Sequence, residues 1–151
     1  MKLGKYFSLE EMTRSQTALR RGINNTPTTE EINNLEDLVF YVLDPIRENF
    51  RLPVSVNSGF RSLQLNEALG SKPTSQHTQG KAADIEIPTV DNLELARWIS
   101  ENMRFDQLIL EFHTPGLPRS GWVHVSWDGE STNRQQVLTI DRNGARVGLP
   151  T

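Results

Sequence analysis

Two short segments of the chain, Ala82-Ala-Asp-Ile-Glu-Ile87 and Trp122-Val-His-Val-Ser-Trp127, decide the fold. Successive side chains of a β-strand point to opposite faces, so each segment divides into two sets of side chains. The apolar set of the first segment, which we expect to face a hydrophobic core, is Ala83, Ile85 and Ile87. Asp84 then projects from the opposite, accessible face of the strand.

The second segment divides in the same way. Its core-facing set is Val123, Val125 and Trp127. His124 belongs to the other set. If the two segments pair as neighbouring strands, Asp84 and His124 stand side by side with their Cβ atoms about 5 Å apart.

The remaining elements predict an α+β domain with helices packed on one face of an antiparallel sheet. Three further short segments have strand character: 53–57, 107–112 and 136–140. Three helices are expected to begin where an acidic residue follows a capping residue by three positions: Ser8 with Glu11, Thr28 with Glu31, and Asp91 with Glu94. A fourth short helix is expected over 62–69, and Pro45 should kink or end the second helix near Leu43.

Composition excludes several classes of protein. The chain has 151 residues, the size of one domain, and we expect a single domain over 1–151. It contains no cysteine, which excludes disulfides, Cys-based zinc sites and a Cys nucleophile. The net charge of −3 argues against bulk nucleic-acid binding. No apolar run is long enough for a membrane span, and no signal peptide is expected.

Three residue positions suggest a metal site. His77 lies in the polar stretch directly before the Asp84 strand, so it could join Asp84 and His124 as a third ligand. Two histidines and one carboxylate, with a fourth position open, are typical of catalytic zinc. The alternative stays open at this point, because a lone histidine in a strand is more often a surface or hydrogen-bonded residue than a ligand.

Glu111 is the candidate for acid–base chemistry. Alternation in Gln107-Leu-Ile-Leu-Glu-Phe112 places Leu108, Leu110 and Phe112 on the core face, so Glu111 points toward the proposed ligands. A carboxylate beside a metal-activated water acts as the general base of a metallohydrolase. A solvated surface glutamate is the alternative. Asp106 and Glu86 are the next candidates for the base.

Two motifs resemble the M15 zinc peptidases, which include D-Ala-D-Ala carboxypeptidases and dipeptidases and phage endolysins. The first is Ser75-Gln-His-Thr-Gln-Gly-Lys-Ala-Ala-Asp84, which matches the pattern S-x-H-x-x-G-x-A-x-D. The second is Trp122-Val-His-Val-Ser126, which resembles the closing zinc-ligand strand of that family. Upstream, Ser58-Gly-Phe-Arg-Ser62 followed by Asn66 resembles a further family segment whose arginine faces the substrate.

The resemblance implies a fold like that of the D-Ala-D-Ala peptidases and the hedgehog signalling domains. It also implies Zn²⁺ held by His77, Asp84 and His124, and substrate binding by Arg61 and Ser75. We expect Arg61 to grip a substrate carboxylate with its planar fork of N–H groups.

One position departs from the family pattern. Several branches place the catalytic acid three residues before the last zinc histidine, where this chain has Gly121. Glu111 instead resembles the acidic residue at the end of the D-Q-L-I-x-E strand found in the phage-type and carboxypeptidase-like branch, so we assign it as the catalytic residue.

The resulting hypothesis is a zinc peptidase that hydrolyses an amide bond in peptidoglycan stem peptides. We expect a monomer, made without a signal peptide, that acts on the bacterial cell wall in phage or prophage lysis. Two rivals remain: a non-catalytic, zinc-bearing binding or phage-structural module of the same fold, which Gly121 keeps open, and a metal-free cell-wall-binding module. The sequence does not distinguish exo from endo cleavage.

Overall fold

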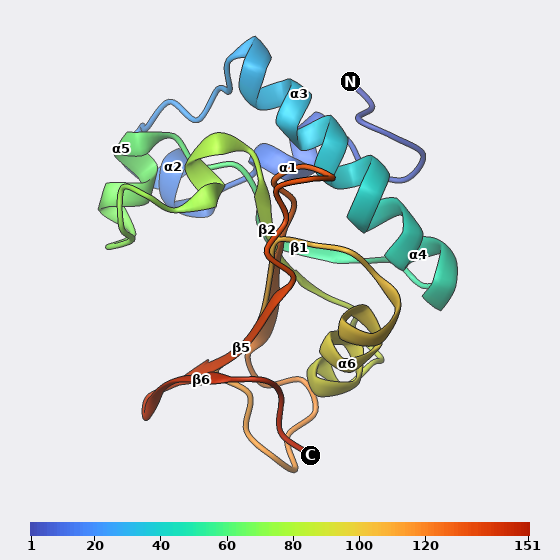
Figure 1. Cartoon of the computed structure of the whole chain (residues 1–151). Helices are drawn as coiled ribbons and strands as arrows, with labels where there is room; N and C mark the ends of the chain where they lie inside the picture. The colour runs from blue at the N-terminus through green and yellow to red at the C-terminus, as the bar shows by residue number, and fades with distance from the viewer.

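The computed structural model describes residues 1–151 and contains one six-stranded sheet with helices around it (Figure 1). The strand order is β1-β2-β4-β3-β5-β6. The strands are β1 (Ser55–Ser58), β2 (Ala82–Glu86), β3 (Gln107–Glu111), β4 (Trp122–Ser126), β5 (Gln136–Asp141) and β6 (Gly144–Val147). The expected α+β class is confirmed.

The predicted pairing of the two deciding segments is also confirmed. β2 and β4 are antiparallel neighbours, with Asp84 directly opposite His124. On the other edge of β4, Ile109 of β3 is opposite His124. Asp84, His124 and Ile109 therefore form one row across the sheet.

The sheet is mostly antiparallel, as predicted, and departs from this at one pair, because β3 and β5 run parallel. Both edges of β4 are occupied, by β2 and by β3, and β5 joins the sheet at the outer edge of β3. β5 runs opposite to β4, as β3 does, which makes β5 parallel to β3. β6, which was not predicted from the sequence, follows β5 through a two-residue turn at Arg142-Asn143 and is exposed along its length.

The helical segments are α1 (Leu9–Thr13), α2 (Gln16–Arg21), α3 (Thr29–Leu38), α4 (Asp44–Phe50), α5 (Leu63–Ala68) and α6 (Asn92–Asn102), with a π-helical turn over Val39–Leu43 and a 3₁₀ turn over Gln76–Gln79. Ser8 and Thr28 each cap their helix with a complete capping box, as predicted. Asp91 accepts a hydrogen bond from the Leu93 N–H at the start of α6. α2, which we did not predict, is capped by Ser15.

Pro45 neither ends nor sharply breaks the long helix. The chain instead widens into the π-helical turn, in which the Asp44 N–H donates to the Val39 carbonyl five residues back, and then continues as α4. Pro45 falls in the first turn of α4, where its missing N–H costs little. In Figure 1, α3 and α4 form one helical run.

The core lies between one face of the sheet and α3, α4 and α6 (Figure 1). The inward side chains of the central strands are buried as alternation predicts: Ala83, Ile85, Leu108, Leu110, Val123 and Val125. Phe112 is an exception to the predicted pattern. It adopts φ +55° directly after β3 ends, and it is 48% exposed rather than buried. No helix in the structure has the length and apolar character needed to cross a membrane.

We predict that this core carries most of the stability of the fold. Leu38→Ala, which truncates a fully buried side chain, should lower the free energy of unfolding by about 2–5 kcal/mol. Leu19→Ala, on a leucine that is 74% exposed, should change it by less than about 0.5 kcal/mol. Chemical denaturation of the two variants measures both values, and equal effects would contradict this description of the core.

Candidate metal centre

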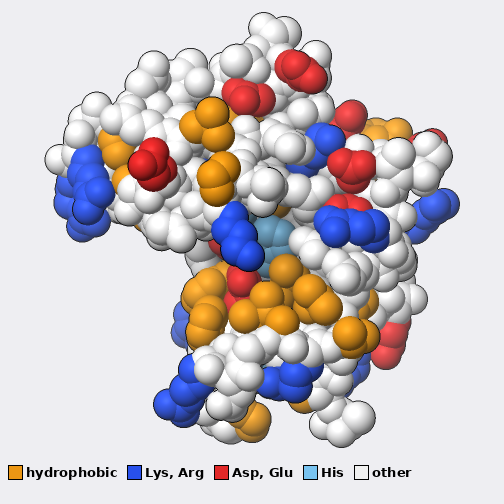
Figure 2. All heavy atoms as spheres, turned by 60° about the vertical axis from the view of Figure 1, so that its left-hand side comes forward, with side chains coloured by type: hydrophobic (Ala, Val, Ile, Leu, Met, Phe, Trp, Pro, Cys, Tyr) orange, Lys and Arg blue, Asp and Glu red, His pale blue; other side chains and the backbone are white.

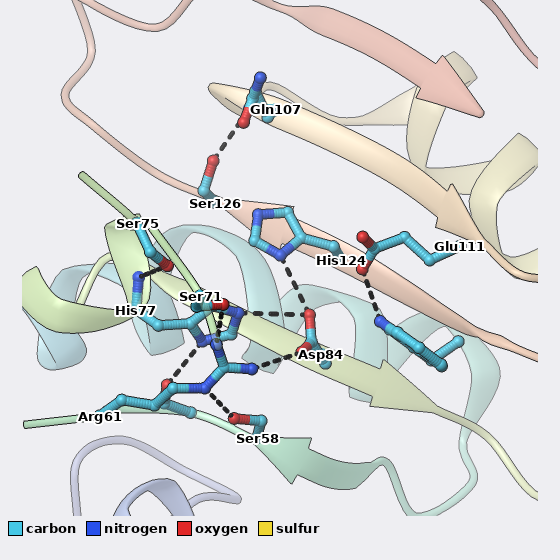
Figure 3. A network of polar contacts seen from close by, with 12 residues as sticks. Ser58, Arg61, Ser71, Ser75, His77, Asp84, Gln107, Glu111, His124 and Ser126 are labelled. Atoms are coloured by element: carbon cyan, nitrogen blue, oxygen red, sulfur yellow. Dashed lines mark hydrogen bonds and ion pairs between the residues drawn. The ribbon is translucent and has the colours of Figure 1, made fainter. Parts of the chain in front are cut away.

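Three side chains from separate elements converge on the open face of the sheet (Figure 3). His77 comes from the 3₁₀ turn, Asp84 from β2 and His124 from β4. The Asp84 Oδ1 atom lies 3.0 Å from His124 Nδ1 and 3.4 Å from His77 Nε2. Each residue offers one possible ligand atom, and these three atoms all lie within 4.8 Å of one another. The structure thus brings together the three ligands expected from the sequence.

The His77 ring is held in one orientation by the backbone. Its Nδ1 atom lies 2.7 Å from the Gly59 carbonyl oxygen, which can only accept, so Nδ1 carries a proton. The Nε2 atom of a neutral ring then directs its lone pair toward Asp84. Such a bond from the outer ring nitrogen to a carbonyl is typical of metal-binding histidines.

The neutral form of His77 leaves a lone pair facing a carboxylate. Burial lowers the pKa of His77, because the charged ring would lose its hydration, although contact with Asp84 acts in the opposite direction. Burial also disfavours the Asp84 carboxylate, but the hydrogen bond with His124 outweighs it, so the pKa of Asp84 lies well below its ordinary value. A neutral histidine and an ionised carboxylate are the protonation states that a metal ion requires.

The spacing of these donors also fits zinc. Zinc–ligand bonds of about 2.0–2.1 Å in a tetrahedral site put the ligand atoms about 3.3 Å apart. The two separations from Asp84 Oδ1, 3.0 and 3.4 Å, are close to this value. We conclude that the donor set fits a zinc ion with one position left for water or substrate.

Glu111, at the end of β3, lies in the same cleft. Its Oε2 atom accepts a 2.6 Å hydrogen bond from the Trp122 indole N–H, which leaves Oε1 without a protein partner (Figure 3). Burial raises the pKa of Glu111, and the nearby Asp84 charge raises it further. A raised pKa makes the Glu111 carboxylate a stronger base, which suits it to accept a proton.

The alternative bases are engaged elsewhere. Asp106 is 2% exposed and accepts hydrogen bonds from Arg134 and Gln76. Glu86 accepts hydrogen bonds from Asn57 and Asn92.

Gly121 cannot be replaced by an acid in this backbone. Its φ is +68°, in the left-handed region that favours glycine. A Cβ atom there would overlap the Glu111 carbonyl oxygen. The end of β3 and the start of β4 therefore lie too close together for a side chain at position 121.

Arg61 is built into the site more tightly than expected. Its guanidinium group donates to Ser58, Asn66, Ser71 and Asp84. Four of the five N–H groups are therefore used, and only one, on Nη2, is left for a substrate. The forked contact that the sequence analysis predicted for Arg61 is not available in this arrangement. Its role in substrate binding remains a prediction.

Ser75 has a structural role in the 3₁₀ turn. Its hydroxyl oxygen accepts the His77 N–H at 3.3 Å, and its carbonyl oxygen accepts the Thr78 hydroxyl at 2.7 Å. Ser75 also lines the cleft, so the prediction that it binds substrate stays open.

The cleft around these residues has a volume of about 670 Å³. Its apolar floor is formed by Ile109, Leu138 and Ile140. Ile109 of β3 pairs with Leu138 of β5, and Ile140 lies two residues further along β5. Figure 2 shows the hollow face, with the histidine in the depression, a basic side chain beside it and apolar side chains next to it. Lys72 and Arg134, which were not predicted from the sequence, also line the cleft. Both lie in loops, where no periodic pattern could have identified them.

His113 stays outside the site, as expected. Its Nδ1 atom lies 3.2 Å from the Ser120 carbonyl oxygen and its Nε2 atom 3.4 Å from Asp91. It is therefore a useful internal control for the other two histidines.

A two-histidine, one-carboxylate set in an open cleft, with a further carboxylate beside it, defines a metallohydrolase type of site. Residues 5–126 match the Peptidase M15 family, a range that covers most of the chain and contains the three candidate ligands, Arg61 and Glu111. The chain belongs to the Peptidase M15 family. Membership indicates a metallopeptidase, and peptidases of this family are typically zinc-dependent. No curated protein matches the chain.

Metal content tests the ligand assignment. Protein purified without chelator should contain about one zinc ion per chain, and His124→Ala should lose most of it, because two donors hold zinc much more weakly than three. His113→Ala should retain the metal, since this ring contacts Ser120 and Asp91 instead. Elemental analysis measures all three. Wild-type protein that neither contains zinc nor takes it up on titration would contradict the assignment.

Proposed function

We propose that this chain is a zinc peptidase that hydrolyses an amide bond in peptidoglycan stem peptides. The observation that carries the proposal is the convergence of His77, Asp84 and His124 in one cleft with the unpartnered Oε1 atom of Glu111. Family membership supports the peptidase chemistry. The choice of stem peptides as substrate rests on the resemblance of the two motifs to cell-wall M15 enzymes.

The three ligands would hold a zinc ion, which supplies a Lewis acid for a carbonyl oxygen and makes a water molecule more acidic. Glu111 would accept a proton from the attacking water at Oε1 and deliver it to the nitrogen of the leaving amine. One water is consumed, the C–N bond breaks, and a carboxylic acid and an amine are released. The Trp122 indole N–H holds the other carboxylate oxygen and so fixes the direction of Oε1.

The remaining residues orient the site and the peptide. Arg61 holds Asp84 in place through the contact between Nη2 and Oδ2, and its free N–H would donate to a substrate oxygen. The Ser75 hydroxyl would contact the peptide from the rim of the cleft. The floor formed by Ile109, Leu138 and Ile140 would accept an apolar side chain of the substrate.

The proposal includes the setting in which the enzyme works. We propose one domain over residues 1–151, acting as a monomer on the bacterial cell wall during phage or prophage lysis, on the basis of the resemblance to phage endolysins. The alternative is a zinc-bearing binding or phage-structural module without catalysis. Gly121 favours that alternative, because the acid that several family branches place at this position is absent. Activity therefore depends on Glu111.

Glu111→Gln separates these two functions. The substitution keeps the shape and the acceptor for Trp122 but removes the basic carboxylate, so zinc content and folding should be unchanged. Release of amine from stem peptides should fall by about 10²–10⁴. Glu94→Gln, at an exposed position on α6, is the matched control and should be fully active. A zinc-loaded wild type that cleaves no stem peptide would favour the non-catalytic module, and full activity of Glu111→Gln would place the base elsewhere.

The pH dependence of the reaction provides a second test of Glu111. The Trp122 N–H donates to the carboxylate and favours its charged form, so Trp122→Phe should raise the pKa of Glu111 further. Because the base must be ionised, the acidic limb of the kcat/KM profile should move to higher pH, and activity at a fixed acidic pH should fall. Trp98→Phe, which alters a ring packed on Phe50 instead, should leave the limb in place. An unchanged limb in Trp122→Phe would argue against Glu111 as the titrating group.

A further inference from the structure

The buried Asp106 carboxylate, behind the cleft, has hydrogen-bond donors on both of its oxygen atoms. Asp106, between α6 and β3, is 2% exposed and accepts four hydrogen bonds. Three come from Arg134: from its backbone N–H at 2.8 Å, from Nε at 3.0 Å and from Nη2 at 2.7 Å. The fourth comes from Gln76 Nε2 at 2.9 Å. Asp106 therefore joins the loop before β5 to the turn that carries His77.

This arrangement fixes the Arg134 guanidinium group by one edge only. Nε and Nη2 form the bidentate contact with Asp106, while both N–H groups of Nη1 and the second N–H of Nη2 have no partner within the chain. The side chain is 55% exposed and lines the cleft. Arg134 thus presents a held, outward-facing fork of N–H groups, which Arg61 does not.

Lys72 adds a free positive charge to the same cleft. It lines the cleft, and its ammonium group forms neither a salt bridge nor a hydrogen bond within the chain. Because the charge of Arg134 is offset by Asp106, Lys72 is the cation that remains uncompensated there. A planar fork together with an ammonium group in the same cleft suits a carboxylate.

The sheet register places this feature relative to the metal centre. Gln107 pairs with Gln136, which follows Arg134 by two residues, and Ile109 is opposite His124. Arg134 therefore adjoins the Gln107 end of β3, and Glu111 marks the other end. Gln107 and Ile109 are about 7 Å apart along the strand, the length of two residues of extended peptide.

We infer that Arg134, positioned by Asp106 and assisted by Lys72, binds a carboxylate of the peptide substrate at the end of the cleft away from Glu111. The inference rests on the proposed function and extends it: the enzyme selects peptides that carry a carboxylate at a defined distance from the bond that is cleaved. Arg134 is a specificity-determining residue and takes no part in the proton transfers.

The test uses a synthetic stem pentapeptide and a set of derivatives, each with one carboxylate converted to the amide. With the zinc-loaded wild type, amidation of one particular carboxylate should raise KM by about 10- to 100-fold with little change in kcat. Arg134→Ala should raise KM for the parent peptide by a similar factor, and that amidation should then have no further effect. Arg146→Ala, which breaks the exposed ion pair with Asp141 on the β5–β6 hairpin, is the matched control and should behave as wild type.

Other results would overturn the inference. One is a wild type whose KM is the same for every amidated derivative. Another is an Arg134→Ala variant whose KM for the parent peptide is unchanged. The third is an Arg134→Ala variant whose KM rises by the same factor for every derivative. If Arg134→Ala does not fold, Arg134→Lys keeps a cation beside Asp106 but lacks the fork, and it should show the same rise in KM.

If the wild type cleaves no peptide, the proposed function fails. The inference is then decided by equilibrium binding of the same peptides to the zinc-loaded protein. The inference is supported if the wild type binds one amidated derivative more weakly than the parent peptide and Arg134→Ala binds the two equally. Equal binding of all derivatives by the wild type overturns it.

Discussion

The antiparallel pairing of β2 with β4, with Asp84 opposite His124, is the constraint on which the rest of the structure depends. The same register buries Ile85 and Val123 against the helices. Because side chains alternate with a period of two, a shift of one residue would turn the ligands toward the core and expose the apolar set. Burial of the core and assembly of the candidate metal centre are therefore enforced by one set of backbone hydrogen bonds.

The third ligand depends on contacts between segments that are distant in the sequence. His77 is oriented by the Gly59 carbonyl group, and a Cβ atom at Gly59 would overlap the carbonyl oxygen of Met12 at the end of α1. The N-terminal helix thus reaches the candidate metal centre through the backbone of the segment before α5. The His77 Nε2 lone pair is therefore held toward the ionised Asp84 carboxylate, and a proton or a metal ion must lie between these two groups. Burial lowers the pKa of His77 and so disfavours the proton.

The two arginines of the cleft illustrate how similar side chains acquire different functions. Arg61 is 13% exposed in its side chain and uses four N–H groups within the chain, one of them on Asp84, so little of its end remains available. The Arg134 side chain is 55% exposed, and only Nε and one N–H of Nη2 bind Asp106, so three N–H groups of its guanidinium remain available for a ligand. What an arginine can bind is decided by the N–H groups that its protein neighbours leave unused.

The sequence alone determined the fold class, the inward and outward faces of β2 and β4, the starts of α1, α3 and α6, and a ligand set that the structure brings together. These features follow from local rules: alternation along a strand, side-chain caps at a helix start, and residue types at motif spacing. Tertiary structure decided the parallel pairing of β3 with β5, the π-helical turn before Pro45, the exposed Phe112 and the partners of Arg61 and Arg134. Each of these depends on which strand edges, carbonyl groups and donors the rest of the chain has already occupied, and that occupancy is a property of the packed molecule rather than of any short segment.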